Sequence, residues 1–459
     1  MGITSSLAAE SSSLPVELLL IIFQYAAEEH HKMESPDYDI NAKIDYLAPI
    51  LEEQQDLSSF TQVCQSWYYA GLPILYRIPY LHSVHHIHLL ARSLRESQLY
   101  EGYVQGLFLG YIPRKTGTIH SWFGRSPVFK QLKSRIDASS LEEDLKFILT
   151  TCPHIDKLSL YHIKYPSSNP SDDYSEYVPI YDMMHWSEEQ DTSHPSPTLP
   201  VIEKLQSLSI CGKFSDGGEL NVSLPSLNYR FATTSLQVLS LRHVYFPYPS
   251  QFPTLPTLQT LRIDQCMLHP AQSTTYKLNT QNLPSLKNLH IEFCYLLSPH
   301  LIEPELLLHL TDLKLLGRDE LQMYSDFSQG MEPNTQSQIR NLAIGAITNA
   351  VSEEITSWIP TSLEKLSIYC FPTVSEYIER SGAVAEAVNK CLNEKRSSGK
   401  FANEEMKLKE ICVVWIIPGS PSGDLSKTLT PQLGTQLKKL REFCEETGIP
   451  CTYMSNVHG

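Results

Sequence analysis

The stretches LQTLRIDQCML (residues 258–268) and LKNLHIEFCYL (residues 286–296) decide the fold. In both stretches, apolar residues stand at relative positions 1, 4, 6 and 9, while polar residues stand at positions 3 and 5. Alternation of this kind predicts a short β-strand that buries one of its two faces. The apolar residue at position 9 then turns the chain inward, so each stretch predicts a strand that leads back into a core.

The same pattern recurs along most of the chain. Its first positions are Val104, Ile155, Leu236, Leu258, Leu286, Ile339 and Leu408, with weaker copies at Leu205, Leu310 and Leu363. From Leu205 to Leu363, successive first positions lie 31, 22, 28, 24, 29 and 24 residues apart, which leaves room for one strand and a returning helix or loop. Such units bury their apolar faces only by stacking on one another, so the pattern predicts a solenoid with a curved parallel sheet.

These units resemble the leucine-rich repeat. The two stretches quoted above match its consensus LxxLxLxxCxL in full, with Cys266 and Cys294 at the cysteine position. The resemblance implies an irregular leucine-rich-repeat arc over residues 79–459, in which these two cysteines are small, buried and inert. Helices are predicted near residues 141–149, 374–394 and 436–446, and an edge strand is predicted after the last of them. Residues 165–200 contain no Lys or Arg and are predicted to be a solvated acidic insertion, with a docking segment for a basic partner as the less favoured alternative.

The N-terminal part predicts a helical module. A first helix is expected over residues 14–26, because Pro15 suits the first turn and Glu17 complements the positive helix end. Its apolar side chains cover more than half of the circumference: Leu18, Leu19, Leu20, Ile22 and Phe23. A helix this apolar must be covered on more than one side, so one side needs a second surface.

A second helix is expected to start at Asp56, a favourable N-cap. Apolar residues follow at helical spacing through Ala70, and Gly71 with Pro73 is expected to end the helix. Residues 27–55 lie between the two helices and predict an insertion that is either a surface loop with one helical turn or an obstruction to partner binding.

Together the two segments resemble the F-box family. The matching elements are Leu14-Pro15-x-Glu17-Leu18-Leu19-x-x-Ile22-Phe23 and Asp56-Leu57-x-x-Phe60-x-x-Val63-Cys64-x-x-Trp67, within residues 12–78. In this family the box docks on the Skp linker subunit of SCF ubiquitin ligases. The resemblance implies that eight residues contribute to the Skp-facing surface or to the core of the box: Leu14, Pro15, Leu18, Ile22, Leu57, Val63, Cys64 and Trp67.

The fold class expected from both resemblances is an α+β or α/β solenoid, with the helical module joined without a linker to the arc. The expected function is that of a non-catalytic substrate adaptor, which brings a protein substrate to a cullin through Skp. The alternative is a protein-binding scaffold outside any ligase, in which the helical module only caps the solenoid.

The concave face of the predicted sheet is the candidate substrate surface. Polar positions of the central units are expected to lie on it or beside it: Arg242, His243, Arg262, Asp264, Gln265, His290, Glu292 and Phe293. Curved sheets of repeat proteins bind other macromolecules, and the mixed polarity of these residues favours a protein partner.

Composition excludes several function classes. Of 459 residues, 36 are Lys or Arg and 51 are Asp or Glu, and a net charge of −15 argues against a general nucleic-acid surface. No apolar run is long enough for a transmembrane span, and the first residues do not resemble a secretory signal. The ten cysteines form no CxxC pair, so reduced thiols in the cytoplasm or nucleus are expected.

Sequence motifs for catalysis are not found, and no cofactor is expected. The chain has no phosphate loop, no G-x-S-x-G nucleophile elbow and no H-E-x-x-H pair. His82, His85 and His86 could share one side of a helix as metal ligands do, but an amphipathic helix with Val84 and Ile87 inward is favoured. The opening Met1-Gly2 fits an N-myristoylation pattern, although no polybasic stretch supports membrane anchoring and chance is favoured.

Overall fold

The computed structural model describes residues 14–26, 47–81, 84–110, 138–163, 204–212, 235–242, 244–246, 252–268, 277–292, 294, 302–316, 337–345, 359–360, 362–370, 375–397, 407–418 and 431–458. The predicted acidic insertion (165–200) lies outside these residues, as do residues 27–46 of the first insertion. His82, His243 and Phe293 also lie outside them, together with the side chain of His85.

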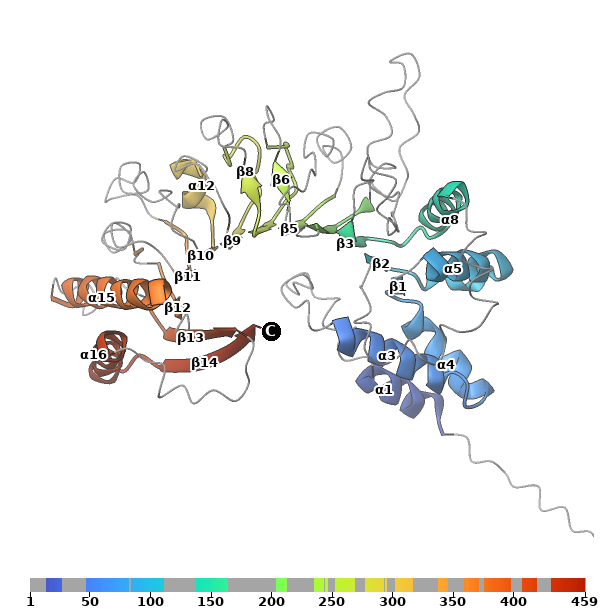
Figure 1. Ribbon diagram of the computed structural model, residues 1–459, viewed down its shortest axis with the longest axis horizontal. Coiled ribbons are helices and arrows are strands. Elements are labelled where there is room, and N and C mark those ends of the chain that lie inside the picture. Colours follow the sequence, from blue (N-terminus) through green and yellow to red (C-terminus); the bar gives the residue numbers. More distant parts are fainter. Residues whose placement is uncertain are drawn as a thin grey trace, which may run out of the picture.

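Within the described residues, twelve parallel strands form one open sheet, and each strand pairs with the next one in the order of the list that follows. They are β1 (Tyr80–Leu81), β2 (Gly106–Gly110), β3 (Lys157–Ile163), β4 (Ser207–Gly212), β5 (Val238–Arg242), β7 (Thr260–Asp264), β9 (Asn288–Glu292), β10 (Asp312–Leu316), β11 (Asn341–Gly345), β12 (Lys365–Cys370), β13 (Glu410–Pro418) and β14 (Cys451–His458). A second, two-stranded sheet pairs β6 (Tyr245–Phe246) with β8 (Met267–Leu268). The sheet bends into an arc with its strands along the inner side (Figure 1).

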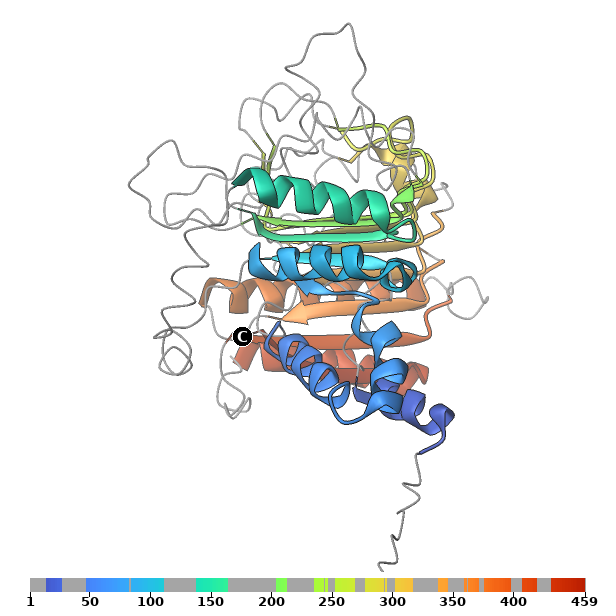
Figure 2. The ribbon, with the colours of Figure 1, turned by 90° about the vertical axis from the view of Figure 1, so that its right-hand side faces the viewer.

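Helices lie on the outer side of this arc (Figures 1 and 2). They are α5 (Val84–Glu96), α8 (Ala138–Thr151), α12 (Pro304–His309), α15 (Ser375–Ser397) and α16 (Pro431–Thr447), together with the short 3₁₀ helix η3 (Gln98–Gly102). Among the described residues, three helices form a separate group at the N-terminal end of the arc: α1 (Val16–Ala26), α3 (Leu47–Phe60) and α4 (Gln65–Leu75). We call this group the N-terminal module.

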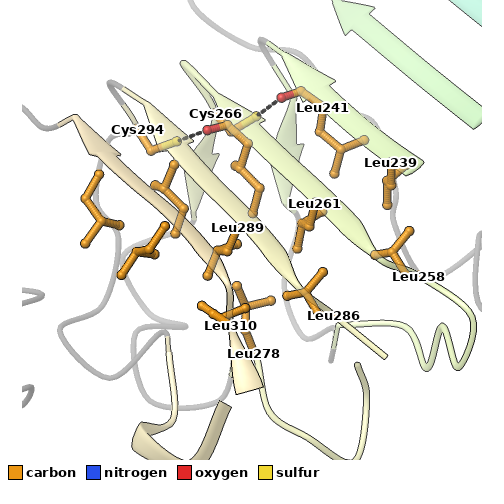
Figure 3. Packing of buried hydrophobic residues seen from close by; sticks show 14 of the residues in the cluster. Leu239, Leu241, Leu258, Leu261, Cys266, Leu278, Leu286, Leu289, Cys294 and Leu310 are labelled. Carbon is orange, nitrogen blue, oxygen red and sulfur yellow. Dashed lines mark hydrogen bonds between the residues drawn. The ribbon is translucent and has the colours of Figure 1, made fainter. Parts of the chain in front are cut away.

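All ten predicted repeat strands are confirmed. Each predicted first position precedes one strand of the sheet, from Val104 before β2 to Leu408 before β13. The apolar positions 4 and 6 stack in register from strand to strand, as in the pairs Leu261↔Leu289 and Ile263↔Ile291. These rows are fully or almost fully buried and form one continuous core (Figure 3). The predicted helices and the edge strand are also confirmed, as α8, α15, α16 and β14.

Cys266 and Cys294 connect one repeat to the previous one. The Cys266 Sγ donates to the Leu241 carbonyl oxygen at 3.4 Å, and the Cys294 Sγ donates to the Ile263 carbonyl oxygen at 3.4 Å (Figure 3). Both side chains are buried, and burial raises the pKa of the Cys266 thiol well above its ordinary value. The prediction that these cysteines are buried is therefore confirmed, and at neutral pH the Cys266 thiol is protonated.

The helix boundaries in the N-terminal module differ from the prediction. One helix was expected from Asp56 to Ala70, but α3 already begins at Leu47 and ends at Phe60, and α4 begins only after Cys64. Residues 47–55, assigned to the insertion, therefore form the first turns of α3. Their Leu, Glu and Gln residues are strong helix formers, which outweighs the capping preference of Asp56.

Gly71 and Pro73 lie inside α4 rather than after it. A Cβ atom on Gly71 would lie 2.6 Å from the Phe23 ring, so glycine is required here because α4 crosses α1 at close range. Tertiary packing, not the end of a helix, thus explains this glycine.

The first repeat was missed by sequence reasoning. The Arg77 carbonyl oxygen accepts hydrogen bonds from the backbone N–H groups of Gln105 and Gly106, at 2.8 and 3.1 Å. The same pair of hydrogen bonds recurs between later units. For example, the backbone N–H groups of Gln259 and Thr260 both donate to the Gln237 carbonyl oxygen. The chain after α4 therefore serves as the first unit of the arc, and Pro79 occupies a position that leucine fills elsewhere.

We expect Gly71→Ala to lower the free energy of unfolding by about 1–3 kcal/mol, because the added methyl group overpacks against Phe23. Gly102→Ala is the matched control, since a Cβ atom there meets nothing within 4 Å. Urea unfolding followed by circular dichroism measures both. Equal stability of the two variants would contradict the close crossing of α1 and α4.

Candidate protein-binding surfaces

Helix α1 has one buried side and one exposed side. Leu19 and Phe23 are 0% exposed and contribute to the core of the N-terminal module. On the opposite side, five apolar side chains are between 36% and 79% exposed: Leu14, Leu18, Ile21, Ile22 and Tyr25. We call these five residues, of which Leu14 stands two positions before the first residue of the helix, the α1 apolar face. A set of adjacent exposed apolar side chains of this size is typical of a protein-interaction site.

The core beneath this face is held by aromatic packing. Phe23, Phe60 and Trp67 come from three different helices and contact one another edge to face, with ring centroids 5.7–5.9 Å apart. Leu57 is fully buried beside them. Such pairs contribute about 0.5–1.5 kcal/mol each beyond the burial of their area. The core therefore fixes the orientation of α1 and keeps its apolar face directed outward.

The eight predicted partner-binding residues separate into two groups. Leu14, Pro15, Leu18, Ile22, Val63 and Cys64 are exposed on the module. Leu57 and Trp67 instead pack into its core. Sequence reasoning did not single out Ile21 and Tyr25, which also lie on the α1 apolar face, although both belong to the almost continuous apolar run of this helix.

The N-terminal module is attached directly to the arc. The rings of Tyr76 and Tyr100 stack with their centroids 4.7 Å apart, and the hydroxyls of Tyr68 and Tyr100 share a hydrogen bond of 2.9 Å. The Arg77 Nε donates to the Gln105 Oε1 at 2.9 Å. Together with the backbone bonds to the Arg77 carbonyl, these contacts set the direction of the module relative to the sheet.

The polar residues of the strands alternate with the leucine rows, so they lie on the opposite face of the sheet. The helices cover the outer side of the arc (Figure 1), and this opposite face is therefore the inner one. In its central part their charges pair with one another. The Arg242 Nε lies 3.1 Å from the Asp264 Oδ2, and the His290 Nε2 lies 3.0 Å from the Asp312 Oδ1. Arg262 is buried on the same face. A partner would therefore meet a surface of largely paired charges.

Glu292 pairs with Lys314, a residue that sequence reasoning did not single out. Their charged atoms are 2.7 Å apart, and the Lys314 ammonium lies 5.0 Å from the centre of the Tyr369 ring. Burial lowers the pKa of Lys314, but the Glu292 carboxylate and Tyr369 outweigh it, so the net pKa is raised. Lys314 stands in register with His290, one of the predicted surface residues. The weak repeat that begins at Leu310 therefore placed Lys314 at an equivalent surface position.

Gln265 does not extend the candidate surface along a strand. Its backbone is left-handed, with φ of 49°, and its N–H donates to the Glu292 carbonyl oxygen at 2.8 Å. The residue therefore forms the turn that follows β7.

Neither a cluster of metal ligands nor a membrane-spanning helix occurs in the described ranges. In that part of the chain, no three His, Cys, Asp or Glu side chains lie close enough together to hold a metal ion. Val84–Glu96 does form the predicted amphipathic helix, with Ile87 buried. No helix in the same residues combines the length and the apolar character needed to cross a membrane.

Comparison with known proteins adds no relative: no protein-family model matches the chain, and no curated protein or solved structure matches it. The interpretation of both surfaces therefore depends on their own geometry.

We expect Leu57→Ala to lower the free energy of unfolding by about 2–5 kcal/mol, because it leaves a cavity in the module core. Leu18→Ala changes the same residue type on the α1 apolar face and should stay within about 0.5 kcal/mol of the parent protein. Urea unfolding, followed by the fluorescence of Trp67 and the other tryptophans, compares the two. A large loss for Leu18→Ala would mean that this face is covered within the chain.

Proposed function

We propose that the chain is a substrate adaptor of an SCF-type ubiquitin ligase. In this proposal the N-terminal module is an F-box that docks on the Skp linker subunit, and the arc is a leucine-rich-repeat domain that holds a protein substrate. The observation that carries the proposal is the α1 apolar face, which remains exposed although its own module and the adjoining arc are folded.

The physical reason is the cost of leaving this face in water. Full burial of one large aliphatic side chain contributes about 1.5–3 kcal/mol, and several such side chains gather here. An apolar helix face with a well-ordered core beneath it can dock on another protein without rearranging. The motif elements around Leu18 and Val63 favour Skp as that protein, because both residues are exposed.

The direct attachment of module and arc supports the adaptor role. An adaptor does no covalent chemistry; it raises the local concentration of a substrate near a catalyst that other subunits supply. A flexible connection would dilute this effect. The Tyr76–Tyr100 stack and the double hydrogen bond to the Arg77 carbonyl hold the two parts in one arrangement.

The concave surface supports a protein as the substrate. It offers ion pairs such as Arg242–Asp264 and Glu292–Lys314, together with hydroxyl groups of Ser159, Ser209 and Ser240 that stand in register on neighbouring strands. Mixed, paired charges of this kind suit a polar protein surface better than a nucleic acid. All ten cysteines are free thiols, which is compatible with action in the cytoplasm or the nucleus.

We expect the full chain, expressed with an affinity tag in eukaryotic cells, to copurify with Skp and cullin. Leu18→Asp should reduce Skp recovery by at least about tenfold, because a buried carboxylate at an apolar interface costs several kcal/mol. Leu99→Asp is the matched control, since Leu99 is an exposed leucine on η3, outside the N-terminal module. Circular dichroism checks that both variants are folded.

Recovery of Skp with the parent chain and with Leu99→Asp, but not with Leu18→Asp, supports the adaptor. Absence of Skp from the parent chain would favour the alternative scaffold, in which the module only caps the solenoid. The Leu18→Asp chain also serves as a substrate trap, because substrates that are no longer ubiquitinated should accumulate on it relative to the parent chain.

A further inference from the structure

Two cysteines meet at the C-terminal end of the arc. Cys444 lies on α16, buried in the core, and Cys451 is the half-buried first residue of β14. Between them the chain reverses at Gly448, which has φ of +71°, and the Ile449 N–H donates to the Cys444 carbonyl oxygen at 3.1 Å. This turn brings both side chains to one core cluster, in which Cys444 is buried and against which Cys451 packs, and each thiol is the largest influence on the pKa of the other.

Packing alone does not explain a cysteine at position 451. It stands in register with Ile411, in a row that holds leucine in the nine described main-sheet strands from β2 to β12. β14 is the last strand of the sheet, so this row is open on one side. Tyr453, the next residue with the same orientation, is 46% exposed. The Cys451 thiol is therefore accessible from the open end of the arc.

The surroundings of Cys451 stabilise its thiolate. The hydrogen bond from the Cys444 thiol, a hydrogen bond from the Tyr453 hydroxyl and the charge of Arg441 together lower the pKa of Cys451 to about 7, although burial opposes them. The hydrogen bond to Cys451 and burial raise the pKa of Cys444. Elsewhere burial acts without such donors and raises the pKa of Cys370 to about 12. Cys451 thus carries the reactive thiolate, and Cys444 keeps its proton.

We propose that Cys444 and Cys451 form a redox-active dithiol, which hydrogen peroxide or an organic hydroperoxide oxidises to an intrachain disulfide. This proposal does not depend on the adaptor function. It rests on the contact between the two thiols, the open end of the sheet and the polar groups of Tyr453 and Arg441.

The chemistry balances in two steps. The Cys451 thiolate attacks one oxygen of hydrogen peroxide, which gives the Cys451 sulfenic acid and a hydroxide ion. The Cys444 sulfur then attacks the Cys451 sulfur, its proton leaves with the departing hydroxyl group as water, and the disulfide forms. With the initial proton of Cys451 counted, two thiols and one peroxide give one disulfide and two waters. The disulfide would link α16 covalently to the last strand of the arc.

The first experiment uses the full chain without substitutions. The protein is treated with hydrogen peroxide, remaining thiols are alkylated with iodoacetamide, and peptides are mapped by mass spectrometry without reduction. We expect the peptides of Cys444 and Cys451 to be joined and to separate after dithiothreitol. Cys64, an exposed thiol on the N-terminal module, should remain alkylated and is an internal control. Oxidation that leaves Cys444 and Cys451 separate would overturn the proposal.

The second experiment measures the rate at which iodoacetamide labels Cys451 as a function of pH. Half of the maximal rate is expected near pH 7, and at pH 7 the rate should be about threefold that of an unperturbed peptide cysteine, since the larger thiolate fraction outweighs the lower nucleophilicity. Tyr453→Phe removes one hydrogen-bond donor, so the midpoint should move to higher pH. Because Tyr453 is half exposed, this variant should fold.

Two further variants separate the roles of the thiols. In Cys444→Ala the sulfenic acid at Cys451 has no partner, so dimedone should trap it. Cys370→Ala removes another buried thiol and should leave both the disulfide and the pH profile unchanged. A labelling midpoint that does not move in Tyr453→Phe, or dimedone trapping equal in Cys444→Ala and Cys370→Ala, would refute the assignment.

Discussion

The parallel stacking of one repeat on the next is the interaction on which the rest of the structure depends. Each unit contributes a short strand whose apolar residues lie in register with those of its neighbours, and at most of the junctions one backbone carbonyl accepts two N–H groups from the following unit. No single unit could bury its leucines alone. The arc, its outer helices and its concave face all follow from this repeated contact.

This constraint also explains how the N-terminal module is positioned. The ladder of double hydrogen bonds does not begin at the first recognisable repeat but at Arg77, immediately after α4. The end of the module is therefore part of the sheet. As a result, the direction in which the α1 apolar face points is set relative to the concave surface, and this is the property that an adaptor between two proteins requires.

The two ends of the arc differ in how the apolar rows of the sheet are covered. At the start, helices with an aromatic core of Phe23, Phe60 and Trp67 adjoin the first strand. At the end, the described chain adds no further strand after β14, and the aliphatic rows finish in Cys451 and Tyr453. A thiol and a phenol tolerate contact with water better than two leucines would. Cys451 is also the residue that we propose forms a redox-active dithiol with Cys444.

The sequence by itself determined the strands, because alternation with a period of two is a local property, and all ten predicted strands form neighbours in one sheet. It also determined that α1 carries more apolar surface than one core can bury. Only the tertiary structure decided that Leu57 and Trp67 lie inside while Leu18 and Ile22 lie outside, because that division depends on where α3 and α4 pack. The same holds for Gly71, for the repeat hidden at Pro79, for the pairing of Glu292 with Lys314 and for the meeting of Cys444 with Cys451. Each of these depends on a partner supplied by a different element, and no local pattern specifies that partner.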